Sequence, residues 1–434
     1  MIRLLLIVLL IAAAPSLSMA GSPQPDGATV GTAKSPAGIA YRWLQRPEAT
    51  YVALAVAWRG GVLQDPPDQP GLSQIASAAL MASPVDDVTV DRIQDMLGDA
   101  DARLELWPEA ATVNATLVAP VADTEWAIRV LAARLFESDL DQSVVDHLAR
   151  NRAAALREWR ASREGAAEVA FFDAVLADRS ASYRAALAAS ADAHPAVTVA
   201  DIQRWRGRQL VRLKAVVTVV APFGPDEIGP LVDILLAGRP AGRKPRPIDL
   251  PQLRSTIPGL VTLKSAAPGN PFVLVGSPYL DQPALQASRL SALVAGGEAS
   301  RLDMSLRGEA GRTYGFLSGV KVAGRMGAVI ASGHVAPEDL DDTIARINAA
   351  WTRLREEGPT PAEIANMKVL MARELNPMRT PSLRLAQRML AHALEGRPPD
   401  TIFDTAAEID AVDLADRSVR LKLMPERPVV VVVR

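Results

Sequence analysis

A proline-rich stretch in the middle of this 434-residue chain limits what the chain can fold into. Residues 237–259 have the sequence AGRPAGRKPRPIDLPQLRSTIPG, with proline at five positions. Such a stretch cannot hold a helix and favours extended, semi-rigid chain. We therefore expect a linker over residues 237–259, which separates an N-terminal domain, residues 30–236, from a C-terminal domain, residues 260–434.

The two halves end in similar sequences. TVADIQRWRGRQLVRLKAVVTVV begins at Thr198, and DAVDLADRSVRLKLMPERPVVVVV begins at Asp410. The two segments align without a gap, and each predicts a short helix followed by a valine-rich strand. Because this repeat is the size of a domain, it indicates two tandem homologous domains and not a solenoid of short units.

Within each half, the predicted strands are grouped apart from the predicted helices. Strands are predicted at residues 51–61, 112–120, 271–280, 313–322 and 327–335. Helices are predicted at residues 71–83, 124–138, 142–165 and 284–297, and at three stretches between 337 and 397. This grouping predicts an α+β fold, in which each domain has a mostly antiparallel sheet covered by helices on one face.

The charge balance gives no sign of a nucleic-acid partner. The chain has 49 acidic and 47 basic residues, so no net charge favours nucleic acid or an anionic membrane surface. It contains no cysteine, which excludes disulfides, thiol catalysis and metal sites with cysteine ligands. Any recognition of a partner must therefore depend on local features.

The first twenty residues resemble a secretory leader. They have the sequence MIRLLLIVLLIAAAPSLSMA, with one arginine, an apolar run from Leu4 to Ala14 and small residues before Gly21. The apolar run is too short to be interpreted first as a membrane span, so we expect a signal peptide at residues 1–20 that is cleaved after Ala20. The mature chain is then expected in the periplasm or outside the cell, with no membrane association.

A motif in the second half carries the strongest functional information. The stretch SRLDMSLRGEAGRTYGF, residues 300–316, contains Arg307 and Tyr314 seven residues apart. It resembles the arginine and tyrosine motif in the second half of the pitrilysin/insulinase family of zinc peptidases. The resemblance extends over essentially the whole mature chain and implies two α+β domains that face each other around a cavity.

The zinc motif of that family is missing from the first half. Where the family has His-x-x-Glu-His after Gly-Leu, this chain has GLSQIASAALM, with Gln74, Ser77 and Ala78 at the three decisive positions. Two histidines one helical turn apart reach the same Zn²⁺, and the glutamate activates the bound water. An amide, a hydroxyl and a methyl group cannot replace them, so we expect no metal in this chain.

No other residues offer a replacement site in the sequence. The family's third ligand, a glutamate, falls near Glu158, and one carboxylate alone would not hold zinc. The four histidines are widely separated: His147, His194, His334 and His392. An independent metal-free hydrolase is also poorly supported, because the sequence shows no pairing of a nucleophile with a base.

The resemblance assigns roles to residues of the second motif. It implies that Arg307 holds the backbone of a peptide substrate and that Tyr314 donates to the oxyanion, so both are candidate catalytic and substrate-binding residues. Phe316, which follows them, is a further candidate for substrate binding. The alternative is purely structural: Arg307 would complement a helix C-terminus, and Tyr314 would pack in a strand.

These observations lead to two hypotheses of function. In the first, the chain is the non-catalytic, substrate-binding and oxyanion-stabilising subunit of a heterodimeric zinc peptidase that acts on peptides. Zinc would then be held by the partner, a zinc-bearing relative, and this chain alone would have no activity and no cofactor. In the second, the chain is an inert scaffold or a peptide-binding member of the same fold.

Overall fold

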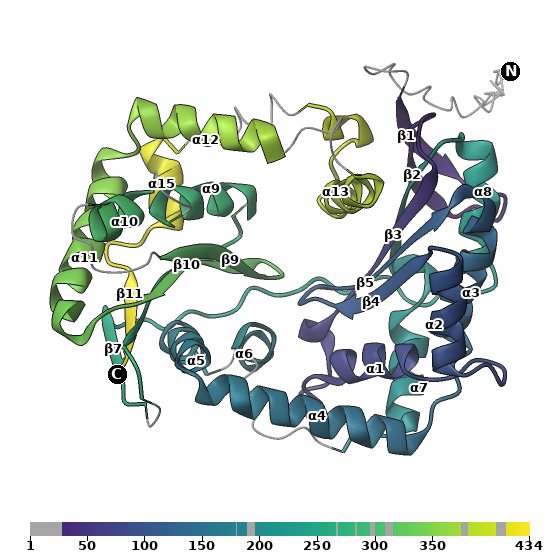
Figure 1. Cartoon of the computed structure of the whole chain (residues 1–434), viewed down its shortest axis with the longest axis horizontal. Coiled ribbons are helices and arrows are strands. Elements are labelled where there is room, and N and C mark those ends of the chain that lie inside the picture. The colour runs from purple at the N-terminus through teal and green to yellow at the C-terminus, as the bar shows by residue number, and fades with distance from the viewer. Residues whose placement is uncertain are drawn as a thin grey trace, which may run out of the picture.

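The computed structural model contains two β-sheets, each flanked by helices (Figure 1). It describes residues 28–178, 180–188, 196–265, 268–282, 284–295, 300–308, 316–374, 381–404 and 414–434. The two sheets consist almost entirely of antiparallel strand pairs, with one parallel pair in each. The predicted α+β class is confirmed.

The first sheet has six strands in the order β1-β2-β6-β3-β5-β4. They are β1 (Thr29–Lys34), β2 (Ala40–Gln45), β3 (Tyr51–Arg59), β4 (Arg103–Pro108), β5 (Thr112–Pro120) and β6 (Ala215–Ala221). The helices of this half are α1 (Leu72–Met81), α2 (Val90–Asp99), α3 (Thr124–Phe136), α4 (Gln142–Ala161), α5 (Arg163–Val175), α6 (Ala181–Ala188), α7 (Val199–Gln209) and α8 (Pro225–Leu236). Short 3₁₀ turns lie at η2 (Val62–Gln64), η3 (Val121–Asp123) and η4 (Arg212–Lys214).

The second sheet has five strands in the order β7-β11-β8-β10-β9. They are β7 (Leu260–Leu263), β8 (Phe272–Leu280), β9 (Leu317–Ala323), β10 (Met326–His334) and β11 (Val429–Val433). The helices are α9 (Ala284–Ala295), α10 (Arg301–Asp303), α11 (Leu340–Glu357), α12 (Pro361–Glu374), α13 (Ser382–Leu394) and α15 (Arg417–Leu423). The π-helical turn η5 (Met304–Gly308) and the 3₁₀ turns η6 (Pro337–Asp339) and η8 (Pro399–Ile402) complete the described elements.

Apart from the extra edge strand β1 in the first sheet, the two sheets share one topology. β6 pairs parallel with β2 and antiparallel with β3, and β11 pairs parallel with β7 and antiparallel with β8. Each of these two strands follows a short helix, α7 or α15, as the repeated sequence predicts. The stretch between α8 and β7 contains no helix or strand, and its prolines favour extended backbone.

The predicted helix over residues 142–165 is wrong in one respect, because the structure divides it at Ser162 into α4 and α5. The Ser162 hydroxyl accepts a hydrogen bond from the Gly165 N–H at 3.0 Å and so caps α5. A Cβ atom at Gly165 would lie 1.9 Å from the Trp159 carbonyl oxygen, which makes glycine necessary at this turn. The break redirects the chain and sends α5 away from the first sheet.

Each sheet packs its own helices on one face, as predicted. In the first half, alternate residues of β3, namely Val52, Leu54 and Val56, lie in a core with residues of α1, α3 and α8. In the second half, Val273 and Val275 of β8 lie in a core with residues of α9 and α11. Strand alternation therefore places one apolar face of each sheet against helices of its own half.

The opposite face of each sheet is covered by helices from the other half. On β3, Ala53, Ala55 and Ala57 lie in a core with Leu385 and Met389 of α13. On the second sheet, α5 and α6 pack against the face that carries Phe272 and Leu274 (Figure 1). We call this arrangement the helix exchange: α5 and α6 cover the second sheet, and α13 covers the first.

None of the described helices combines the length and the hydrophobicity that a transmembrane segment requires. The predicted signal peptide, residues 1–20, lies outside the described residues.

Candidate functional site

The degenerate zinc motif lies on α1, at the helical position that the sequence predicts. The helix begins after Gly71, whose backbone is left-handed with φ of 87°. Gln74 and Ala78 are partly exposed and one turn apart, whereas the Ser77 side chain is 1% exposed. The chain therefore keeps the helix of the motif and changes only the side chains on it.

A carboxylate caps the start of this helix. Asp65 accepts hydrogen bonds from the backbone N–H groups of Gly71 at 3.2 Å and Ser73 at 3.1 Å, and another from the Ser73 hydroxyl. The Trp205 indole N–H donates to the same Ser73 hydroxyl at 3.0 Å. A negative charge at a helix N-terminus is favourable, but burial is the larger effect and raises the pKa of Asp65 to about 6.

The side chains of α1 do not fit a zinc ion. Gln74 Oε1 and Ser77 Oγ are buried and have no hydrogen-bond partner among the described residues. A zinc site needs imidazole, thiolate or carboxylate ligands, and α1 offers none at these positions. In the described part of the chain, no group of three His, Asp or Glu side chains comes close enough to hold a metal ion.

The neighbouring helix α4 does not supply a metal ligand to α1. It packs against α1, but Glu158 near its C-terminal end is exposed to solvent. The α4 side chain that interacts with the Asp65 carboxylate is Arg152, a cation. Burial lowers the pKa of Arg152, and Asp65 opposes that change. A partly buried cation beside α1 would repel a second cation there.

The second predicted motif lies far from the first. Arg307 is in the π-helical turn η5, directly after α10, and its side chain lies outside the described residues, as does all of Tyr314. Figure 1 shows α10 and α1 on opposite sides of the molecule. The structure therefore does not bring the Arg307 segment to the degenerate motif of the same chain.

Two neighbours of Arg307 and Tyr314 have clear structural positions. Arg301 forms an ion pair with Glu363 of α12 at 2.8 Å and donates to the Gly358 carbonyl at 2.8 Å. Phe316 is 3% exposed and packs in the core of the second half. The roles predicted for Arg307, Tyr314 and Phe316 remain predictions.

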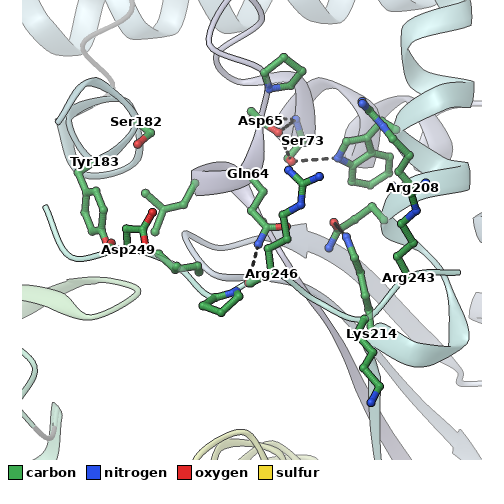
Figure 2. A pocket seen from close by; sticks show the side chains of 18 of the residues that line it. Gln64, Asp65, Ser73, Ser182, Tyr183, Arg208, Lys214, Arg243, Arg246 and Asp249 are labelled. Carbon is green, nitrogen blue, oxygen red and sulfur yellow. Dashed lines mark hydrogen bonds between the residues drawn. The ribbon is translucent and has the colours of Figure 1, made fainter. Parts of the chain in front are cut away.

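A large pocket beside α1 was not predicted from the sequence. Its volume is about 1060 Å³, and it is lined by η2, Asp65, Ser73, residues of α6, the end of α7 and the linker between Gly242 and Gln252 (Figure 2). The linker is held there by the Gln64 amide, which donates to the Arg246 carbonyl at 3.2 Å, and by the Tyr183 hydroxyl, which donates to the Asp249 carbonyl at 2.6 Å. The linker is thus part of a binding-sized cavity.

Positive charge predominates in this pocket. Its lining includes five basic residues and two acidic ones: Arg208, Lys214, Arg243, Lys244, Arg246, Asp65 and Asp249. The linker sequence contains four basic residues between Arg239 and Arg246, which could have indicated a site for an anionic ligand. The prolines among them suggested only a spacer between the two domains. The candidate functional regions are therefore α1, the Arg307 turn and this pocket, which we call the basic pocket.

Comparison with known proteins identifies the fold. Residues 196–371 match the family described as the peptidase M16 inactive domain. No curated protein sequence matches the chain. A peptidase M16 inactive domain from Pseudomonas fluorescens has a similar structure, with a TM-score of 0.80 at 16% identity, over 93% of this chain and 98% of that one.

Two longer proteins contain a unit like this chain. The periplasmic protease PqqL from Escherichia coli matches with a TM-score of 0.70 at 14% identity, over 99% of this chain and 49% of PqqL. Pitrilysin matches with a TM-score of 0.69 at 14% identity, over 97% of this chain and 46% of pitrilysin. The chain therefore spans about half the length of these two proteins.

The second half thus matches the model of the peptidase M16 inactive domain over residues 196–371, and nearly the whole chain has the same fold as these peptidase structures. The resemblance predicted from the Arg307 and Tyr314 motif is confirmed, and the changed side chains on α1 fit a non-catalytic member of that group.

Proposed function

We propose that this chain is the non-catalytic, substrate-binding and oxyanion-stabilising subunit of a heterodimeric zinc peptidase that acts on peptides. The observation that carries the proposal is the state of α1. The helix is present and capped by Asp65, whereas Gln74, Ser77 and Ala78 supply neither metal ligands nor a general base. Hydrolysis would therefore require another chain.

The length of the chain supports a partner of similar size. The unit covers 49% of PqqL and 46% of pitrilysin, so each of those chains is long enough for a second unit. We propose that here the second unit is a separate polypeptide with an intact His-x-x-Glu-His, which holds the zinc. Such an obligate complex should bury more than about 2,000 Å².

The position of Arg307 supports action in trans. Because η5 lies on the opposite side of the molecule from α1, Arg307 would act at a site on another chain and not at α1 of its own chain (Figure 1). There the Tyr314 hydroxyl would donate to the substrate oxygen that gains negative charge, and the Arg307 guanidinium would donate to a substrate carbonyl. Phe316, which packs in the core of the second half, is proposed as a further residue of the substrate-binding segment.

The proposed location is the periplasm. Residues 1–20 have the features of a cleavable signal peptide, and PqqL, which has the same fold, is a periplasmic protease. A zinc-bearing partner would need to be exported to the same compartment.

The first test is assembly followed by kinetics. We expect co-expression with the zinc-bearing relative to give a stable heterodimer by size exclusion, and the complex to cleave peptides. In that complex, Tyr314→Phe should preserve assembly but lower turnover about a hundredfold, the loss typical of one oxyanion donor. Arg307→Ala should raise the Michaelis constant at least as clearly as it lowers turnover.

A matched control removes a hydroxyl elsewhere. Tyr51→Phe deletes the hydroxyl that bonds to Asp101 at the surface of the first half and should leave turnover unchanged. Wild-type rates in both Tyr314→Phe and Arg307→Ala would reject the subunit role and favour an inert scaffold. Elution of the chain as a monomer beside an untouched partner would count against the heterodimer.

A further inference from the structure

The basic pocket has the shape of a site for a sizeable ligand. Its volume of about 1060 Å³ is at the upper end of the range for small-molecule sites. Figure 2 shows Tyr183, Ser182 and Asp249 at one end, with Arg208, Arg243 and Lys214 at the other and Arg246 between them. The ligand that fills such a space must be extended and in contact with several elements.

The cations of the pocket lack carboxylate partners within the described chain. Arg208, Arg243, Lys244 and Arg246 form no ion pair with any described residue, although the lining contains Asp65 and Asp249. Burial lowers the pKa of Lys214, and the nearby charges of Arg208 and Arg246 lower it further. Unbalanced positive charge of this kind favours an anionic ligand.

The linker offers hydrogen bonds to the backbone of such a ligand. Residues 243–250 belong to no helix or strand, and Pro245 and Pro247 favour extended backbone around them. None of the backbone N–H groups of the six other residues donates to a described residue. An extended segment with free N–H groups can pair with a peptide strand, as an exposed sheet edge does. A phosphate oxygen can also accept from a backbone N–H, but a peptide strand can pair with several of these donors along the length of the segment.

We propose that the basic pocket binds an extended acidic peptide segment, whose carboxylates face Arg208, Arg243 and Arg246 and whose backbone lies along linker residues 243–250. The pocket begins at Ser73 in the first turn of α1, so a peptide held there lies beside the degenerate motif. This inference names the substrate class for the proposed function and rests on it. The peptidase would therefore select acidic stretches through its inactive subunit.

The test measures peptide binding to the isolated full chain by fluorescence anisotropy. Three labelled ten-residue peptides of equal length are compared, one rich in glutamate, one in glutamine and one in lysine. We expect the glutamate peptide to bind at least about tenfold more tightly than the glutamine peptide, and the difference to shrink as salt screens the charges. The lysine peptide should bind least.

Paired variants locate the site. Arg243→Glu with Arg246→Glu should weaken binding of the glutamate peptide at least about tenfold, since both cations line the pocket. The control pair, Arg92→Glu with Arg157→Glu, makes the same change in net charge at exposed residues of α2 and α4. It should leave the dissociation constant unchanged. Arg243→Gln with Arg246→Gln provides a milder pocket variant if the reversal perturbs folding, which circular dichroism would reveal.

Several results would overturn the proposal. Equal binding of the three peptides, or equal losses in pocket and control pairs, would mean that the pocket has no role. Tighter binding of inorganic polyphosphate, with full displacement of the peptide, would assign the site to phosphate compounds instead. This assay contains no partner chain, so a negative result would reject the acidic-peptide site without affecting the tests of the heterodimer and of Tyr314. Failure of those tests would likewise not affect the peptide-binding result.

Discussion

At the scale of single residues, α1 has a capped N-terminus, but two of its buried side-chain oxygens have no hydrogen-bond partner among the described residues. The Asp65 carboxylate accepts hydrogen bonds from two backbone N–H groups at the N-terminus of α1. Gln74 Oε1 and Ser77 Oγ, in contrast, are buried without a described partner. A buried polar atom without a hydrogen bond is costly. The chain therefore differs from the zinc motif in the side chains at the ligand positions, whereas the helix that carries them is present.

Restoring the ligands should restore only weak metal binding. The triple change Gln74→His, Ser77→Glu and Ala78→His returns two imidazoles one turn apart, but Arg152 remains close to Asp65 and no third ligand is in place. We expect zinc in the variant to be lost on gel filtration, although calorimetry should detect binding. Tight stoichiometric zinc in the wild-type chain would contradict this account of the site.

Asp65 should make stability depend on pH. Burial raises its pKa from 3.8 to about 6 in the folded state, so the folded chain binds the proton more tightly than the unfolded chain. Its contribution to stability is full below about pH 4 and is lost as the pH rises through about 6. Relative to Asp65→Asn, the wild type should therefore be more stable at pH 4 than at pH 7.

Urea unfolding of the two proteins at both pH values measures this difference. The other carboxylates are the same in both, so their contributions cancel. A difference between wild type and Asp65→Asn that does not change with pH would show that the carboxyl titrates near its ordinary value.

At the scale of elements, the helix exchange depends on small residues that admit helices from the other half. The alanines of β3 let α13 approach the first sheet, and the Thr218 hydroxyl of β6 donates to the Ala386 carbonyl of α13 at 2.8 Å. On the second sheet, a Cβ atom at Gly276 would lie 2.3 Å from the Phe171 ring of α5. Gly276 therefore makes the space that Phe171 occupies.

Gly276→Ala should destabilise the protein by about 1–3 kcal/mol, because the added methyl group forces Phe171 to move within a packed core. The control is Gly319→Ala on the edge strand β9, where an added Cβ atom meets nothing within 4 Å. The control should change stability by less than about 0.5 kcal/mol. Urea denaturation of both variants tests the contrast, and equal effects would show that α5 does not press on β8.

The sequence predicted most elements but not their partners. Strands β3, β5, β8 and β10 and helices α1 and α3 follow local apolar patterns, which depend on near neighbours alone. The apolar residues Phe171 and Phe172 indicate burial, but nothing local tells which sheet they cover. The basic pocket was missed for the same reason, since the linker meets α7 and η2 only after long-range folding.

At the scale of the whole molecule, the helix exchange ties the two halves together. Removal of either half would uncover a sheet face of the other, on which Ala53, Ala55, Phe272 and Leu274 are buried. The linker adds contacts of its own, since Ala177 N–H donates to the Gln252 carbonyl at 2.9 Å. The two halves should therefore unfold together, although each has its own sheet.

We expect a single thermal unfolding transition for this reason. Calorimetric and van't Hoff enthalpies should agree, as in a cooperative two-state transition. The variant Leu385→Ala on α13 should lower the midpoint of that one transition, with a cost of about 2–5 kcal/mol, while Arg384→Ala on the exposed face of the same helix should not. Two separate transitions, with only one shifted by Leu385→Ala, would show independent halves.

Because the N-terminus is synthesised first, the helix exchange also determines the order in which parts of the fold can form: the first sheet is made before the helix α13 that covers it. The first sheet has all its strands once β6 is made, but α13 follows α8 by roughly 150 residues, which takes about 8–30 seconds at common rates of synthesis. During that interval one face of the sheet stays open to chaperones. For a chain exported as we propose, this delay keeps the first half unfinished, and so fit for passage through a narrow translocation channel, until nearly all of the protein has been made.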